Sequence, residues 1–265
     1  MGAGAGVTMD STVFTRGWRV GVLGLVAGGA VCLAALLPRL AQDPAYHRFA
    51  DPRALGGVPN AANVLSNVAF LLAGLAGLAA IRAGPPLLDR RERAPWLTFF
   101  AAVALVGPGS AWYHLAPSNG SLVWDRLPMA VAFAAFLVAV LAERIGPAAA
   151  RLLAPAAVAA AATVAYWFVT EAMGRGDLRP YALAQYAPLL LVPLVLLLYP
   201  ARYSHGAAWL AGLALYGLAK AAELLDAPLL AVTGIVGGHA VKHLLAAAAV
   251  GVFAWMVRVR SPSVR

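Results

Sequence analysis

The stretch that decides the fold is residues 236–258, which read VGGHAVKHLLAAAAVGVFAWMVR. Its apolar run is interrupted by His239, Lys242 and His243, and no further charge follows before Arg258. A helix needs about 20 apolar residues to cross the hydrocarbon core of a bilayer, so this stretch predicts a membrane span. Each charged group inside a membrane costs about 2.5 to 3.5 kcal/mol or more, so such polar residues mark a candidate functional site.

The rest of the chain has the same apolar character. Of its 265 residues, 62% are hydrophobic and 12% are charged, and the mean hydropathy is +0.78. Soluble domains contain about 45 to 50% apolar residues, so the composition predicts an all-α, polytopic bundle of transmembrane helices. Short connections between spans predict antiparallel neighbours in one compact bundle. Seven further spans are expected, roughly at 19–38, 63–82, 96–115, 123–142, 148–169, 181–199 and 207–224.

Three segments follow from these spans. Residues 1–62 are expected to form an N-terminal anchor helix and an external segment, 63–258 a seven-helix core, and 259–265 a cytoplasmic tail. The first span follows Arg16 and Arg19, as the apolar region of a signal peptide would. It is longer than the usual region of about 7 to 15 residues and lacks a small-x-small cleavage site, which favours an uncleaved anchor over a signal peptide.

The charge distribution predicts the orientation of the bundle. The net charge of +9 does not indicate nucleic-acid binding, because the arginines lie in short loops between apolar runs. With the N-terminus inside, twelve arginines fall on the cytoplasmic side and six outside. Positive residues favour the cytoplasmic side, so both termini are expected there. The richness in alanine, glycine and arginine is compatible with a GC-rich bacterial genome, and we expect a multi-pass protein of the bacterial inner membrane.

A second polar patch lies at residues 107–114, Gly-Pro-Gly-Ser-Ala-Trp-Tyr-His, and is followed by Asp125. In the predicted topology His114 ends one span outside, Asp125 begins the next, and His239 begins the last. Three of the five histidines are therefore expected to meet Ser110 and Asp125 in the outer half of the membrane.

The residue types in these patches indicate a metal site. His239 and His243 are four residues apart, which places both imidazoles on one helix face. With His114 they offer three neutral imidazoles and an open fourth position, the pattern of a catalytic zinc ion. The lone Cys32 excludes a thiolate-rich structural site. The alternative is that the histidines only pack, with hydrogen bonds across helices.

In the catalytic interpretation, Asp125 would orient or deprotonate a water activated by the metal, and Ser110 would donate a hydrogen bond. Other polar residues are expected to be structural. Lys220 and Glu223, three residues apart, predict a buried ion pair. His47 and His205 lie in predicted loops and are expected at the surface.

Four ordered motifs give the chain a resemblance to a known family. These are Asn63-Val-Leu-Ser66-Asn67, Gly109-Ser110-Ala-Trp-Tyr-His114, Asp125-Arg-Leu-Pro128-Met129 and Gly238-His239-Ala-Val-Lys-His243. From about Phe49 to about Ala248 the chain resembles the alkaline ceramidases, especially their bacterial ceramidase-like relatives. The resemblance implies a seven-helix membrane hydrolase in which His114, His239 and His243 bind zinc and Ser110 and Asp125 complete the catalytic site.

The expected function is a zinc-dependent amidase that cleaves ceramide-like N-acyl lipids of the membrane into a fatty acid and a sphingoid-type amine. The animal enzymes carry an acidic calcium-binding segment before the first core helix, whereas residues 49–60 here offer only Asp51 and Asn60 as oxygen ligands, so calcium is not predicted. The same superfamily contains receptors of the progestin and adiponectin type, and a non-catalytic lipid receptor with a structural zinc is the alternative. A transporter receives little support, because no inverted repeat is visible.

Overall fold

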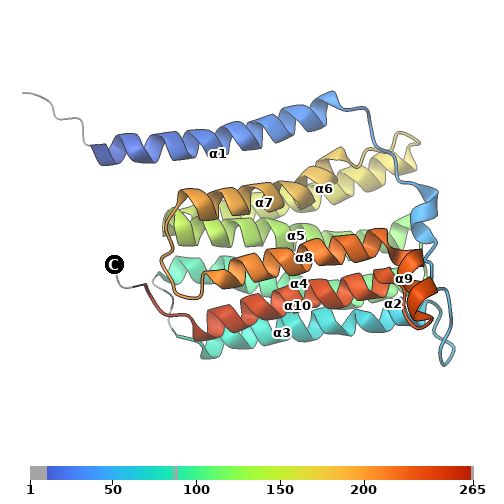
Figure 1. Ribbon diagram of the computed structural model, residues 1–265. Coiled ribbons are helices and arrows are strands. Elements are labelled where there is room, and N and C mark those ends of the chain that lie inside the picture. The colour runs from blue at the N-terminus through green and yellow to red at the C-terminus, as the bar shows by residue number, and fades with distance from the viewer. Residues whose placement is uncertain (1–10, 86, 88, 264–265) are drawn as a thin grey trace, which may run out of the picture.

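The computed structural model describes residues 11–85, 87 and 89–263, and these residues form an all-α bundle with no strand (Figure 1). Two short helices, α2 and α9, lie at one end of the bundle. Single 3-10 turns occupy Pro44–His47, Arg90–Glu92 and Pro147–Leu152. The helices are α1 Ser11–Leu36, α2 Ala61–Ser66, α3 Val68–Ala83, α4 Arg93–Leu115, α5 Asn119–Arg144, α6 Leu153–Ala172, α7 Arg179–Leu198, α8 Ala207–Leu224, α9 Asp226–Thr233 and α10 Gly238–Val259.

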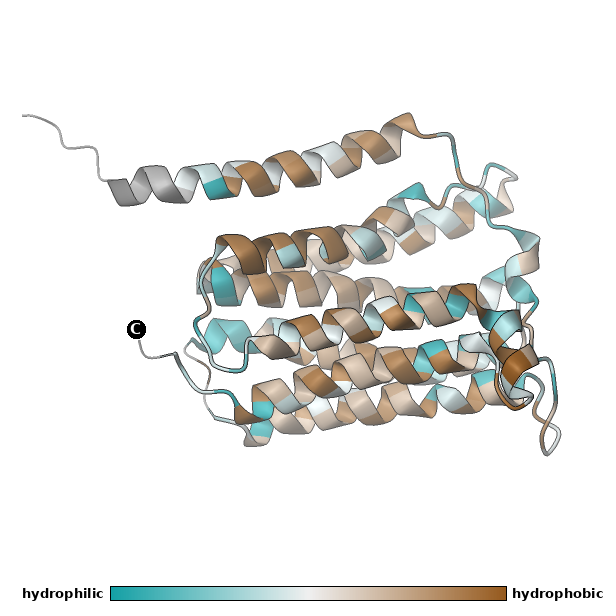
Figure 2. Ribbon diagram, viewed as in Figure 1, coloured by the Kyte–Doolittle hydropathy of each residue, from teal (hydrophilic) through white to brown (hydrophobic). Residues whose placement is uncertain are grey.

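The length and hydropathy of the helices confirm a polytopic membrane bundle. Seven helical segments of the described chain are long and apolar enough to cross a membrane. Helix α8 meets the same criteria together with α9, from which it is bent by 82°, so the pair makes an eighth span if it is counted as one. Figure 2 shows the apolar surface along the helices and more hydrophilic residues near their ends.

Two expected spans depart from a continuous helix. The span predicted at 63–82 is interrupted at Asn67, which separates α2 from α3. The Asn67 side-chain amide donates to the Asn63 carbonyl oxygen at 2.7 Å and so competes with regular helical hydrogen bonding. The span predicted at 148–169 begins with the 3-10 turn Pro147–Leu152 before α6. The hydrogen bond at Asn67 is a local contact that an average over apolar residues does not detect.

Helix α1 lies outside the packed bundle. It runs along α7, and no residue of its apolar window is buried inside the protein (Figure 1). The Arg179 guanidinium donates to the Ala35 carbonyl oxygen at 3.2 Å and so ties the end of α1 to α7. The first predicted span is thus a peripheral helix whose apolar surface is left for lipid. The predicted segments 1–62 and 259–265 extend beyond the described residues at 1–10 and at 264–265.

At the end of the bundle that holds the C-terminus, buried ion pairs join the helix ends. Arg202 donates to one carboxylate oxygen of Glu92 at 2.9 Å, and the Tyr203 hydroxyl donates to the other at 2.6 Å. Arg260 pairs with Glu143, and both side chains are almost completely buried. Large aromatic side chains form the core next to this cluster: Trp96, Phe100, Trp209 and Phe253.

The described start of α1 and the end of α10 lie at the same end of the bundle, opposite α2 and α9 (Figure 1). From the arginine distribution we predict that this end is cytoplasmic. A reporter fused after Arg265 is expected to be active in the cytoplasm, and one inserted in the 39–60 segment is expected to be active outside. An external signal from the C-terminal fusion would reverse the orientation and contradict the prediction.

Candidate metal centre

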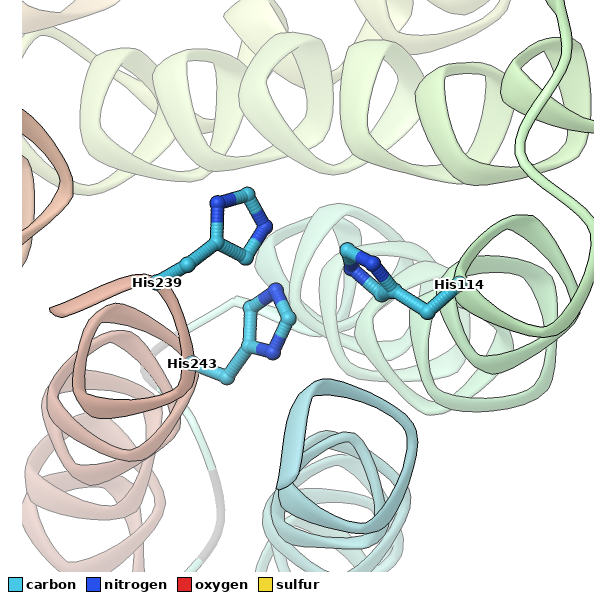
Figure 3. Close-up of side chains that lie close together, drawn as sticks. All are labelled: His114, His239 and His243. Carbon is cyan, nitrogen blue, oxygen red and sulfur yellow. The ribbon is translucent and has the colours of Figure 1, made fainter. Parts of the chain in front are cut away.

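Three buried histidines from two helices meet at the end of the bundle opposite the C-terminus. His114 lies in the last turn of α4, and His239 and His243 lie in the first two turns of α10 (Figure 3). Their ring centroids are 4.9 to 5.0 Å apart in all three pairs. Each ring offers a nitrogen within 4.8 Å of the other two. The three residues are therefore placed to hold one metal ion.

The geometry is close to what such an ion requires. Nitrogens bound tetrahedrally at about 2.0 to 2.1 Å from an ion are about 3.3 Å apart, so small rotations of the three rings would bring them to that spacing. The buried Nδ1 atom of His114 has no hydrogen-bond partner among the described residues. A buried imidazole nitrogen without a partner is costly, and a bond to a metal ion would satisfy it.

A hydrogen bond indicates which nitrogen of His243 can bind. The Ser66 hydroxyl donates to the Asn63 carbonyl oxygen at 3.0 Å, so its single proton is already used. Ser66 Oγ also lies 2.8 Å from His243 Nδ1, and it must accept there. Nδ1 of His243 therefore carries the proton, and Nε2 is left with a lone pair for a metal.

The start of α10 is held by a residue that the sequence analysis did not single out. Asp226 Oδ1 accepts a hydrogen bond from the backbone N–H of His239 at 2.8 Å, which satisfies one of the free donors at this helix N-terminus. Asp226 Oδ2 accepts from the Ala50 N–H at 3.1 Å. A Cβ atom on Gly238 would lie 2.0 Å from the Ala222 carbonyl oxygen, so a glycine is required where α10 approaches α8. A lone acid between apolar runs was the available sequence signal for Asp226.

Ser110 and Asp125 come from neighbouring helices and lie beside the histidines. A Cβ atom on Gly109 would lie 2.1 Å from the Trp124 carbonyl oxygen, so this glycine allows α4 and α5 to approach closely. The close approach brings the next residues of the two helices together, so that Ser110 and Asp125 lie near each other on the wall of one cavity. Both side chains are buried. The structure thus places all five predicted site residues at one end of the bundle.

The segment before α2 covers the histidines. The Phe49 ring lies 4.6 Å from the ring of His114 and 5.1 Å from that of His239. His47 was expected at the surface, and this was wrong: it is half-buried, with its ring nitrogens 3.0 Å from the Tyr113 hydroxyl and 3.1 Å from Asn119 Oδ1. These two contacts fix the covering segment to α4 and α5. His205 is exposed, as predicted.

A cavity of about 660 Å³ adjoins the candidate centre, and Ser110, Asp125, His239 and His243 contribute to its wall. A smaller pocket of about 120 Å³ shares wall residues with it, including Phe70 and Met129. The small pocket extends between the helices toward the aromatic core and is lined by apolar side chains such as Phe99, Phe136 and Phe253. The side chains that line the two pockets are polar near the histidines and apolar in the smaller pocket.

Ion pairs on the cavity wall are more extensive than the sequence suggested. Glu223 pairs with Lys220, as predicted, but its other carboxylate oxygen accepts from Lys242 Nζ at 2.9 Å. Lys242 Nζ also lies 3.0 Å from His239 Nε2. The predicted pair of Lys220 and Glu223 is therefore present, but its carboxylate also serves a second lysine, because α8 and α10 pack side by side at this level.

Neither a scan against protein-family models nor a search of curated proteins finds a match to this chain. The assignment of a function therefore depends on the chemistry of the centre itself.

Proposed function

We propose that the protein is a zinc-dependent amidase of the membrane that hydrolyses ceramide-like N-acyl lipids to a fatty acid and a sphingoid-type amine. The observation that carries this proposal is the cluster of three buried histidines beside a cavity whose wall includes two of them, His239 and His243, together with the buried Ser110 and Asp125. If these residues only packed the helices together, there would be no reason for four polar side chains to line the same cavity.

The donor set supports zinc in particular. Neutral imidazoles suit zinc, and three protein ligands leave a coordination position for a reactant. Of the described residues, His114, His239 and His243 would hold the ion, with Ser66 orienting the His243 ring. When bound, zinc supplies a Lewis acid that polarises an amide carbonyl and makes water a better nucleophile at neutral pH.

The remaining groups supply proton transfer and charge stabilisation. In the proposed reaction the carboxylate of Asp125 accepts a proton from the attacking water and returns it to the nitrogen of the leaving amine as the C–N bond breaks. The hydroxyl of Ser110 donates to the substrate carbonyl oxygen as that oxygen gains negative charge. The acyl carbon gains the hydroxyl group of water and the amine gains its proton, so the products are a fatty acid and a free amine.

The two neighbouring pockets support a lipid as the substrate. Their polar part lies at the histidines, where an amide and head group would be placed, and the apolar part would receive the first carbons of an acyl chain. An acyl chain gains little from leaving lipid for water, so access from between the helices is expected.

The experiment is hydrolysis of a fluorescently labelled ceramide by the purified protein in detergent. We expect release of the amine, its loss after treatment with a chelator, and its recovery when zinc is added back. Zinc-independent release would contradict the proposed chemistry. A fully metallated, folded protein that binds the lipid without cleaving it would identify a non-catalytic lipid receptor instead.

A further inference from the structure

We propose that Arg126 forms an anion-binding subsite beside the candidate centre, so that the substrate carries a phosphate, sulfonate or carboxylate in its head group. This inference rests on the proposed function for its substrate and deepens it, because a simple ceramide has no such charge. The predicted role of Arg126 is to bind the substrate and not to take part in proton transfer.

The first argument is the state of the guanidinium group. Arg126 is 5% exposed and lies on the wall of the large cavity. Its Nη2 atom donates to Gln42 Oε1 at 2.6 Å, whereas its buried Nη1 atom has no hydrogen-bond partner among the described residues. The described chain places no carboxylate oxygen within 4.0 Å of it, so Arg126 lacks the anion that a buried cation usually has.

Aromatic rings fix the group without neutralising it. The guanidinium carbon lies 4.3 Å from the ring centroid of Trp167 and 5.0 Å from that of Tyr181. Contacts of this kind stabilise the charge and orient the planar group. They leave the N–H groups of Nη1 without an acceptor among the described residues, and a guanidinium group can donate to an oxygen of a phosphate or carboxylate.

The second argument is the charge of the cavity wall. Its described residues include four cations, Arg48, Arg126, Lys220 and Lys242, and three carboxylates, Asp125, Glu223 and Asp226. Two of the three carboxylates are already engaged: Glu223 by the two lysines and Asp226 by two backbone N–H groups. A bound anion would balance the remaining positive charge.

The position of Arg126 also limits where that anion lies in the substrate. Arg126 follows Asp125 directly in α5, and both line the same cavity. The anionic group would therefore lie in the same cavity as the amide on which Asp125 would act. This describes an N-acyl lipid whose oxyanion is only a few bonds from the amide nitrogen.

The first test compares the hydrolysis of a ceramide with that of the same ceramide phosphorylated on its primary hydroxyl, and with an N-acyl amino acid that carries a carboxylate. A hydrogen bond between Arg126 and a charged head group is expected to raise kcat/KM for an anionic lipid about tenfold or more above that for the neutral ceramide. The variant R126Q is expected to lose that preference while it retains turnover of the neutral ceramide, and R126K to keep part of the preference. R175Q, which removes an exposed cation outside this cavity, is the matched control and is expected to keep the preference.

The second test measures binding without turnover, with dodecyl phosphate and dodecanol as probes. Wild-type protein is expected to bind the phosphate about tenfold more tightly or better, and R126Q is expected to bind the two probes alike. Equal binding by the wild type, or an unchanged preference in R126Q, would overturn the subsite. An equal loss of turnover for neutral and anionic lipids in folded R126Q would also overturn it, since Arg126 would then act on Asp125.

The two proposals fail in different ways. If no lipid is hydrolysed but the phosphate binds in an Arg126-dependent manner, the subsite stands and the amidase does not. If the neutral ceramide is hydrolysed and Arg126 affects neither preference nor binding, the amidase stands and the subsite does not. The thermal stability of R126Q and R126K, measured in parallel, separates both cases from misfolding.

Discussion

Alanine at His239 or His243 is expected to reduce bound zinc from about one ion per chain to nearly none. Removal of one of three protein ligands leaves too few donors to hold the ion, and either variant leaves one imidazole on α4 and one on α10. Metal analysis of the purified variants gives the result directly. Loss of lipid hydrolysis should accompany the loss of zinc.

The matched control for these variants is alanine at His205. This histidine is exposed between α7 and α8, at the end of the bundle away from the candidate centre. Its removal is expected to leave the zinc content unchanged. Equal zinc in the wild type and in both centre variants would show that these histidines do not bind the ion and would return them to a packing role.

Asparagine at Asp125 is expected to lower the rate of hydrolysis by at least about a hundredfold, the usual contribution of a positioned general base. The amide keeps the size and the hydrogen-bonding ability of the carboxylate but cannot accept the proton. Because Asp125 is not one of the three clustered nitrogen ligands, most of the zinc should be retained. The measurements are hydrolysis, zinc content and thermal stability on the same preparation.

A structural role of Asp125 would give the opposite pattern. If the carboxylate served only to neutralise Arg126, D125N would retain activity and lose stability. The contacts do not favour that role, since Arg126 donates to Gln42 and makes no ion pair with Asp125 within 4.0 Å in the described part of the chain. D89N, at the other end of the bundle, is the control for a general effect of removing a carboxylate. An active D125N protein would remove Asp125 from the proposed mechanism.

The sequence was sufficient to predict the helical bundle and the convergence of the histidines. Long apolar runs have few alternatives to a membrane helix, because backbone hydrogen bonds must be satisfied within the segment. Successive spans cross the membrane in alternating directions. The end of the span that holds His114 and the start of the span that holds His239 therefore fall on the same side of the membrane. No side-chain contact was needed for either prediction.

The parts that could not be predicted depend on contacts between distant segments. Phe49 covers the histidines because the segment before α2 is held in place by hydrogen-bonding contacts such as those of His47 with Tyr113 and Asn119. Asp226 reaches the start of α10 because the chain turns by 82° after α8. Neither segment has a periodic pattern, and so their conformation is set by partners that are remote in the sequence.

The helices are held together by different kinds of bond at the two ends of the bundle, so the two ends would respond differently to the supply of metal. At the C-terminal end the ion pairs of Glu92 and Glu143 are built entirely from the chain. At the other end, α4 and α10 would be cross-linked by an ion taken from solution. Binding of that ion stabilises the folded state in proportion to the logarithm of its free concentration. A low concentration of metal would therefore destabilise the end with the cavity first. The ion pairs at the opposite end would keep the helices assembled, so that the ion could bind again.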